Sequence, residues 1–437
     1  MRSLLTVSSV LLVWMLVASP VMAKQIRLEV SLDKPTLLAA KKQTTFIKVG
    51  LTGFKTDGDK RRAPVNVAIV LDKSGSMSGQ KLEKAKEAAI AAIERLNKND
   101  IVSVVAYDST VTVVVPATKL TDKRALIERI RKITAGGSTA LFAGVSKGAA
   151  EIRKLAEKNR VNRVILLSDG LANVGPKSPS ELGALGASLM KERIAVSTMG
   201  LGLDYNEDLM TKLAQNSGGN HVFIEDADQL VQVFNSEFND VLSVVAQEVS
   251  IRIVAAKGIR PVRVLNTASE INGQTVIVLM NQIYSEQEKY VLLEVEVPAG
   301  KAGQSREIAE VKVSYANMQT NTTDRLSSSV SANFSDSLAV VEKNLNVLVC
   351  TDCVLQLANA QNILATSLRD RGDVAGARRV LITNSRYLNG RICRWKSLRE
   401  KLGRLSRRAA RTPANRPYRS PRHQACLRQP RARTCPR

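Results

Sequence analysis

The sequence predicts a doubly wound, mostly parallel α/β sheet combined with an antiparallel β-sandwich and a C-terminal helical segment. Three observations lead to this fold class. Between residues 64 and 243, short apolar strand patterns alternate with amphipathic helix patterns, which is typical of a parallel sheet covered by helices on both faces. Residues 25–54 and 246–330 alternate apolar and polar side chains with a period of two, as antiparallel strands do. Residues 336–390 show helical spacing.

The first 23 residues are typical of a secretory signal peptide. Arg2 precedes the apolar run Leu4–Ala18, and Val21-Met22-Ala23 supplies the small or modest residues that a signal peptidase reads. An uncleaved anchor is the alternative, but an apolar run of 15 residues followed by Pro20 is short for a membrane span of about 20 residues. We therefore expect export with cleavage after Ala23, to the periplasm or the outside of the cell envelope.

Two regions of alternating pattern flank the α/β domain. The N-terminal β segment, residues 24–60, holds two alternating runs separated by Asp33-Lys34-Pro35. The predicted β-sandwich domain, residues 246–330, holds five more. One hypothesis joins both regions in a single sandwich into which the α/β domain is inserted. The alternative is two separate β units.

Within the α/β domain, residues 64–243, strands and helices follow one another. Val65–Leu71 is apolar apart from Asn66, as a strand buried on both faces is. Asp108-Ser109-Thr110 predicts a hairpin, and the capping box Ser178-Pro179-Ser180-Glu181 predicts the start of a helix that runs to about Arg193. The other predicted elements are helices at 79–97, 121–133, 141–158, 207–215 and 228–245 and strands at 101–107, 111–115, 164–167, 194–199 and 221–224.

The end of the chain changes in composition. Residues 336–390 are expected to form a helical hairpin, with its turn at Arg371-Gly372-Asp373. The chain has a formal net charge of +24, and residues 391–437 carry +15 of it, with sixteen Lys or Arg against one acid, Glu400. This location argues against nucleic-acid binding by the folded domains. The tail is either a disordered basic segment for an anionic partner or a frameshift product; we favour the frameshift slightly and infer no function from the tail.

The cysteines lie only in the C-terminal part of the chain. The five are Cys350, Cys353, Cys393, Cys426 and Cys435. The pair Cys350-Thr-Asp-Cys353 has the spacing of a redox pair or of half a zinc site, but no second such pair and no pair of histidines completes a zinc site. We therefore expect a structural pair, with or without a disulfide.

Three polar motifs occur at boundaries between elements of the α/β domain. The stretch Val65–Met77 ends in Asp72, Ser74 and Ser76, three oxygen side chains at the carboxyl end of a strand, where open α/β sheets bind ligands. A second motif, Gly-Gly-Ser-Thr139-Ala-Leu, lies between two helical runs, and Gly144 follows. A third, Leu-Ser-Asp169-Gly, ends a strand.

In this order, the three motifs resemble the metal loops of the von Willebrand factor A domain, which form its metal-ion-dependent adhesion site. The resemblance covers roughly residues 64–243. It implies that the metal ligands are Asp72, Ser74, Ser76, Thr139 and Asp169. It also implies a protein partner that presents a carboxylate to the bound ion.

The types of the implied ligands favour a hard cation. Five oxygen donors without His or Cys suit Mg²⁺, Mn²⁺ or Ca²⁺ rather than zinc, and we expect Mg²⁺. Only Asp72 and Asp169 carry charge, so the ion should remain electrophilic and accept a carboxylate from a partner. Lys73 is expected to be a solvated charge at the rim, and Asp204 and Glu207 to belong to a helix N-terminus.

The sequence therefore predicts an exported, non-enzymatic, metal-dependent protein-binding module with an adhesion or scaffold role. A metal-assisted hydrolase is the alternative, but no base is visible, because His221 and His423 lie outside the three motifs. A third hypothesis is a regulatory subunit of a cell-envelope complex. Nucleic acid is not an expected partner, and membrane contact is expected to be peripheral or absent.

Overall fold

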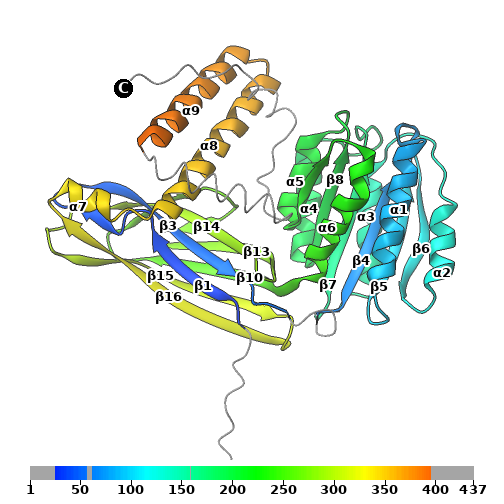
Figure 1. The fold of residues 1–437 in the computed structure, drawn as a ribbon, viewed down its shortest axis with the longest axis horizontal. Helices are drawn as coiled ribbons and strands as arrows, with labels where there is room; N and C mark the ends of the chain where they lie inside the picture. The colour runs from blue at the N-terminus through cyan, green and yellow to red at the C-terminus, as the bar shows by residue number, and fades with distance from the viewer. Residues whose placement is uncertain (1–24, 57–61, 158, 395–437) are drawn as a thin grey trace, which may run out of the picture.

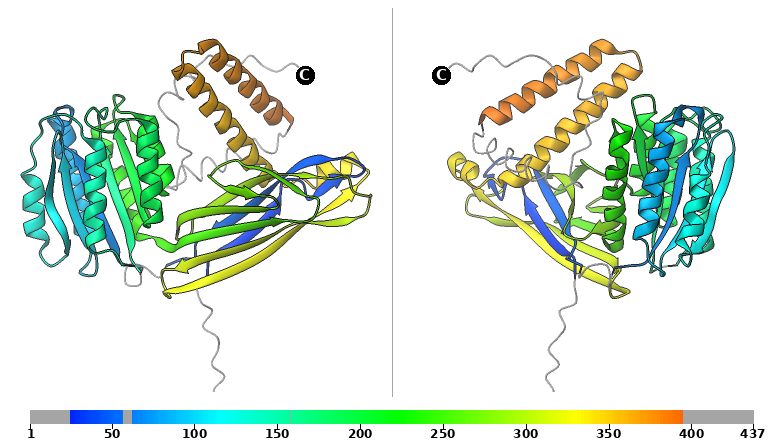
Figure 2. Two further views of the ribbon diagram at one scale, coloured as in Figure 1. Left: turned by 180° about the vertical axis from the view of Figure 1, so that it is seen from behind. Right: turned by 45° about the vertical axis from the view of Figure 1, so that its right-hand side comes forward.

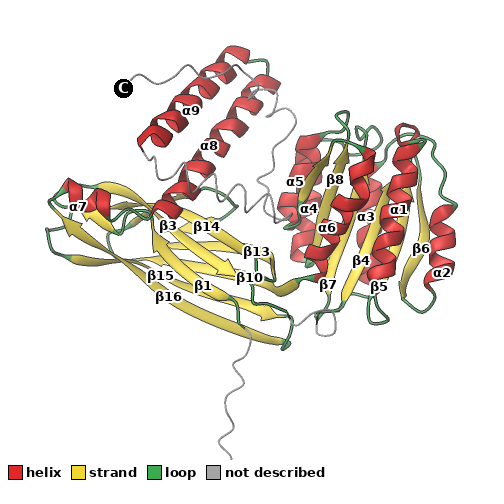
Figure 3. Ribbon diagram, viewed as in Figure 1, coloured by secondary structure: helices red, strands yellow, loops and turns green. Residues whose placement is uncertain are grey.

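The structure is a computed structural model of the 437-residue chain and describes residues 25–56, 62–157 and 159–394. The described residues form an α/β domain, a β-sandwich and a helical hairpin (Figure 1). The α/β domain contains both strands and helices, whereas the sandwich is built from strands and the hairpin from helices (Figure 3). The predicted signal peptide and the tail from residue 395, with His423, Cys426 and Cys435, lie outside the described residues.

The α/β domain is built on one six-stranded sheet, which confirms the predicted fold class. Its strand order is β6-β5-β4-β7-β8-β9. Neighbouring strands are parallel except β5 and β6, which form the predicted antiparallel hairpin. The strands are β4 (Val65–Asp72), β5 (Ile101–Tyr107), β6 (Val111–Lys119), β7 (Val161–Ser168), β8 (Ile194–Leu201) and β9 (His221–Ile224).

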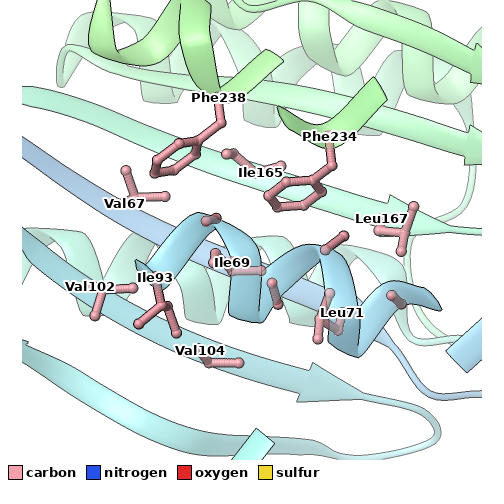
Figure 4. Packing of buried hydrophobic residues seen from close by; sticks show 14 of the residues in the cluster. Val67, Ile69, Leu71, Ile93, Val102, Val104, Ile165, Leu167, Phe234 and Phe238 are labelled. Atoms are coloured by element: carbon pink, nitrogen blue, oxygen red, sulfur yellow. The ribbon is translucent and has the colours of Figure 1, made fainter. Parts of the chain in front are cut away.

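Helices cover both faces of this sheet. The helices α1 (Gln80–Arg95), α2 (Lys123–Arg131) and α6 (Leu230–Leu242) share one apolar core with the sheet, and α3 (Leu141–Lys154), α4 (Pro179–Lys191) and α5 (Glu207–Ser217) share the other. Phe234 and Phe238 of α6 and Ile93 of α1 pack against apolar side chains of β4, β5 and β7 (Figure 4). The capping box at Ser178 is present and begins α4 as predicted.

The β-sandwich combines strands from both sides of the α/β domain in the sequence. Its sheets have the orders β1-β3-β14-β11 and β12-β13-β10-β15-β16-β2, and they share one apolar core. β3 pairs with β14, and β2 pairs with β16, so the α/β domain is an insertion in a single sandwich. The strands are β1 (Arg27–Leu32), β2 (Thr36–Leu38), β3 (Gln43–Thr52), β10 (Val244–Ala255), β11 (Arg260–Val264), β12 (Glu270–Asn272), β13 (Thr275–Tyr284), β14 (Glu288–Val297), β15 (Ser305–Asn317) and β16 (Thr322–Ser335).

Several boundaries differ from the predicted ones. The helix expected to continue to residue 245 ends at Leu242, and β10 begins at Val244. The strands β2, β12 and β16 were not predicted. In β16 the side chains of Ala332 and Phe334 are buried, and the other side chains of the strand are exposed or half-buried. The many Ser and Thr residues of β16 obscure its period of two in the sequence.

The helical hairpin consists of α8 (Val347–Asp370) and α9 (Val374–Arg394), and a short helix, α7 (Leu338–Lys343), precedes it. The first turns of α8 pack on the four-stranded sheet, where Val349 and Cys353 meet Leu292. The rest of the hairpin projects away from the sandwich (Figure 2). The side chains of Cys350 and Cys353 are both buried. The helix α8 is long and apolar enough to cross a membrane, and 33% of its most apolar stretch is buried in the protein. Core helices of soluble proteins can have the same length and composition.

A buried polar cluster joins the α/β domain to the β-sandwich. Arg163 of β7 is fully buried and donates hydrogen bonds to Ser197 Oγ at 2.7 Å, to Tyr284 Oη at 2.9 Å and to the side-chain oxygen of Gln282. Its guanidinium also lies 3.4 Å from Glu237 Oε1 of α6. Because Gln282 and Tyr284 belong to β13, this one cation connects the parallel sheet, α6 and the sandwich.

Asp240, one turn after Glu237, makes the stability of this junction depend on pH. Burial, and then the charge of Glu237, raise the pKa of Asp240 from 3.8 to about 6, although Gln287 donates to its Oδ1 at 2.9 Å and Arg163 and Lys289 oppose the shift. The folded chain therefore binds this proton more tightly than the unfolded chain does. The free energy of unfolding should fall as the pH rises from about 4 to about 6, and stay lower above that range.

Asp240→Asn keeps the acceptor of the Gln287 hydrogen bond and removes the buried charge. We expect the variant to exceed the wild type in free energy of unfolding by about 1–3 kcal/mol at pH 7.5 and to match it near pH 4. Urea denaturation at the two pH values measures both differences. A constant difference between the two proteins at both pH values would contradict the assignment.

Candidate metal centre

The first loop of the site begins where β4 ends. Asp72 is fully buried, and Ser74 donates its backbone N–H to Oδ1 at 2.8 Å. The other carboxylate oxygen, Oδ2, accepts hydrogen bonds from Ser168 Oγ at 2.5 Å and from Tyr107 Oη at 3.3 Å. Burial raises the pKa of Asp72, and the hydrogen bonds from Ser168 and Ser74 oppose that shift. The carboxylate is therefore held in one orientation by its neighbours.

The second loop is bound to the first through the backbone. The N–H of Gly136 donates to the carbonyl of Lys73 at 2.8 Å, and the N–H of Gly75 donates to the carbonyl of Gly137 at 3.0 Å. Gly137 has a φ of +74°, and a Cβ there would come within 2.9 Å of Ser109 Oγ, so this position requires glycine. These contacts fix the position of the buried Thr139, which follows two residues later.

The third loop brings the second carboxylate to the same place. Asp169, which is buried, directly follows β7, and its Oδ1 accepts a hydrogen bond from Ser76 Oγ at 2.7 Å. The hydroxyl oxygens of Ser74 and Ser76 are 3.2 Å apart. A Cβ on Gly170 would lie 3.4 Å from both Ser76 Oγ and Thr139 Oγ1. All five side chains predicted as metal ligands therefore gather at the carboxyl edge of the parallel sheet.

The donors in this cluster fit a hard divalent cation. They are two carboxylates and three hydroxyls, with no nitrogen or sulfur among them, which suits Mg²⁺, Mn²⁺ or Ca²⁺. In the described part of the chain, no group of three or more His, Cys, Asp or Glu side chains is placed to hold a metal ion. A site at this edge therefore depends on the hydroxyls of Ser74, Ser76 and Thr139 as well as on the acids.

Two lysines beside the cluster are paired with acids. Lys73 was predicted to be a solvated rim charge, which is wrong: it forms an ion pair with Asp108, and its side chain is only 18% exposed. Burial alone would raise the pKa of Asp108, but hydrogen bonds from Lys73 and Thr110 lower it. Lys81, near the start of α1, places its ammonium 2.5 Å from Asp169 Oδ2. Glu207 lies in the first turn of α5, as predicted, whereas Asp204 lies in the loop before the helix and not at its N-terminus.

Sequence reasoning missed four side chains that position the candidate ligands. Tyr107 had a usable signal, because it ends β5 and pairs in register with Asp72 of β4. Ser168 had one too, since it immediately precedes Asp169. No sequence signal indicated Asn173 or Lys81. The Oδ1 of Asn173 accepts a hydrogen bond from the backbone N–H of Thr139 at 2.7 Å. Both contacts depend on the tertiary fold.

Lys81→Met should tighten Mg²⁺ binding by about tenfold, because the Lys81 ammonium repels a divalent ion held by Asp169. Its side chain is 37% exposed, so solvent screens part of this repulsion. Isothermal titration calorimetry measures the change. The matched control is Lys84→Met on the same helix, which removes an ammonium paired with Glu87 and should leave the affinity as it is. Equal affinities for all three proteins would show that Lys81 does not oppose the cation.

The α/β domain is similar to domains of known proteins. The family model of the von Willebrand factor type A domain matches residues 66–236. A Synechocystis protein is 28% identical over 62% of this chain and 66% of its own length, and YfbK of Escherichia coli is 27% identical over 48% and 37%. Human inter-alpha-trypsin inhibitor heavy chain H3 is 29% identical over 39% of this chain and 20% of its own. The matches thus span two thirds or less of these relatives.

Two solved structures share the fold over most of the described residues. A von Willebrand factor type A protein from Catenulispora acidiphila has a TM-score of 0.64 at 18% identity, covering 83% of this chain and 88% of its own. The ArnB paralog VWA2 from Sulfolobus acidocaldarius has a TM-score of 0.57 at 17% identity, covering 83% and 89%. The family match identifies residues 66–236 as a von Willebrand factor type A domain, and the two structures share the fold of the chain around it.

Proposed function

We propose that this chain is an exported, non-enzymatic binding module that grips an acidic residue of a partner protein through a divalent cation, with Mg²⁺ as the preferred ion. Domains of the von Willebrand factor type A family generally mediate interactions between proteins, and the match of residues 66–236 to this family supports a protein-binding role. The signal-peptide pattern of residues 1–23 supports export to the cell envelope.

The observation that carries the proposal is the meeting of five oxygen side chains from three separate loops. Asp72, Ser74 and Ser76 come from the first loop, Thr139 from the second and Asp169 from the third. The hydrogen bonds from Ser168 and Tyr107 to Asp72 fix one carboxylate in advance, which lowers the cost of arranging the ligands. When bound, the cation supplies an electrophilic position for a carboxylate oxygen.

The position of the cluster leaves it accessible to a partner. The chain enters β4 and leaves α6 at the amino-terminal edge of the sheet, where the β-sandwich lies (Figure 1). The candidate ligands lie at the opposite, carboxyl edge. Ser76 is exposed there, while Asp72, Ser74, Thr139 and Asp169 are buried. A partner can therefore approach the site without meeting the sandwich.

The proposal is for a binding module because, among the described residues, the one histidine lies away from the cluster. His221 is in β9, which β8 separates from β7. Burial lowers its pKa to about 3, and its ring nitrogens form hydrogen bonds with Thr198 Oγ1 at 2.8 Å and Tyr205 Oη at 3.2 Å. Its imidazole is thus engaged in the core of the domain.

The test is capture of cell-envelope proteins on the immobilised chain in Mg²⁺ or in EDTA, with the wild type and Asp72→Ala. We expect a defined set of proteins that is captured only by the wild type in Mg²⁺. Circular dichroism establishes that the variant is folded. Capture that persists in EDTA and with Asp72→Ala would contradict the proposal. Metal-dependent turnover of generic esters or phosphates would favour a hydrolase.

A further inference from the structure

Within the described part of the α/β domain, most of the large exposed apolar side chains lie at the edge of the sheet that holds the candidate metal centre. Four are exposed in the described part of the α/β domain: Leu155 at 36%, Leu171 at 58%, Val174 at 37% and Leu203 at 71%. Three of these four lie in the loops that follow β7 and β8, at the carboxyl edge of the sheet. Leu155 alone lies elsewhere, after the end of α3. We call Leu171, Val174 and Leu203 the apolar rim.

Hydrogen bonds connect the apolar rim to the candidate ligands. The backbone N–H groups of Asn173 and Val174 donate to the carbonyl of Thr139 at 3.1 and 3.3 Å. Leu171 is two residues after Asp169. On the neighbouring strand, Gly200 pairs in register with Ser168, and Leu203 follows Gly200 by the same number of residues as Leu171 follows Ser168. The rim is therefore continuous with the loops that hold the oxygen donors.

We propose that the apolar rim and the metal centre form one surface, which recognises a segment of a partner protein in which an Asp or Glu is flanked by large aliphatic side chains. The inference rests on the proposed function and adds the class of partner sequence. The cation takes the carboxylate, and the three rim side chains bury the aliphatic neighbours. A cation that bound only the partner's carboxylate would not distinguish one acidic residue from another. The apolar rim therefore provides the selectivity between partner sequences.

The composition of the rim supports this choice of partner. An acidic peptide without apolar neighbours would leave Leu171 and Leu203 in water. Exposed apolar groups beside a polar site are typical of protein-interaction surfaces. Aliphatic groups of a partner would remove this surface from water at the moment the carboxylate meets the cation, so both contacts form together.

A peptide library with one fixed central aspartate and randomised flanks, displayed and selected on the full chain in Mg²⁺, tests the inference. We expect enrichment of Leu, Ile, Val, Met or Phe within about three positions of the aspartate, the reach of an extended segment across neighbouring loops. The double variant Leu171→Ser with Leu203→Ser should bind the selected peptide at least ~tenfold more weakly. Leu155→Ser is the matched control and should bind it like the wild type.

The outcomes separate this inference from the proposed function. Selection that needs Mg²⁺ but shows no apolar preference, with the double variant binding as well as the wild type, overturns the rim and leaves the metal-dependent module standing. Absence of any Mg²⁺-dependent selection overturns both. If sedimentation shows a dimer of the wild type that the double variant loses, and peptide binding is unchanged, a second copy covers the rim and the inference is wrong.

Discussion

Arg163→Met should lower the free energy of unfolding by about 3–5 kcal/mol, because it leaves the charge of Glu237 buried without its cation. The exposed fraction of the Glu237 side chain is 3%, and only Ser197 and Asn220 remain to donate hydrogen bonds to it. The substitution also leaves Gln282 and Tyr284 of the sandwich without their partner in the parallel sheet. Chemical denaturation followed by circular dichroism measures the loss.

Two further variants separate the buried charge from a general effect of losing an arginine. Arg153→Met removes an exposed pair with Glu192, with side chains 46% and 37% exposed, and should change stability by less than about 1 kcal/mol. The double variant Arg163→Met with Glu237→Gln should recover part of the loss, since the buried charge of Glu237 is removed together with its cation. A loss for Arg153→Met as large as that for Arg163→Met would contradict the account of the junction.

Asp169→Asn should weaken Mg²⁺ binding by roughly 100- to 1,000-fold, because at an effective dielectric constant of about 20 a unit charge pair at about 4 Å is worth about 4 kcal/mol. The substitution keeps the shape of the side chain and an acceptor for Ser76, so the three loops should stay in place. It removes one of only two carboxylates in the candidate set. Calorimetric titration with MgCl₂ measures the affinity.

Asp204→Asn is the matched control for this charge change. Asp204 is exposed and lies in the loop after β8, at the same edge of the sheet but outside the donor set. Solvent and salt screen its charge, so the affinity for Mg²⁺ should change by no more than about twofold. If both variants weakened Mg²⁺ binding equally, Asp169 would act through long-range electrostatics at this edge of the sheet and not as a metal ligand.

The parts of the fold that the sequence predicted depend on local pattern. The apolar run of β4 and the capping box of α4 can each be recognised from a few consecutive residues. The hairpin of β5 and β6 can be recognised from the residues of its turn. The three motifs of the candidate site are local too, because each is short and lies at an element boundary. Parallel strands then bring those boundaries to one edge, so the gathering of Asp72 and Asp169 follows from the topology.

The features that escaped prediction depend on contacts between distant residues. Arg163 meets Tyr284 of another domain, and nothing near either residue in the sequence indicates the other. Lys81 reaches Asp169 only because α1 packs beside the end of β7. The strand β16 was missed for a different reason, since Ser and Thr are common in loops and only the burial of Ala332 and Phe334 reveals its period.

Isothermal titration calorimetry of the full chain with MgCl₂ measures whether the five oxygen donors hold a cation. We expect one Mg²⁺ per wild-type chain and no binding heat for Asp72→Ala, with both proteins folded by circular dichroism. The side chain of Asp72 is buried and held by Ser168 and Tyr107, and the measurement needs no ligand other than the ion. The same binding isotherm for the wild type and Asp72→Ala would contradict a metal centre at this edge of the sheet.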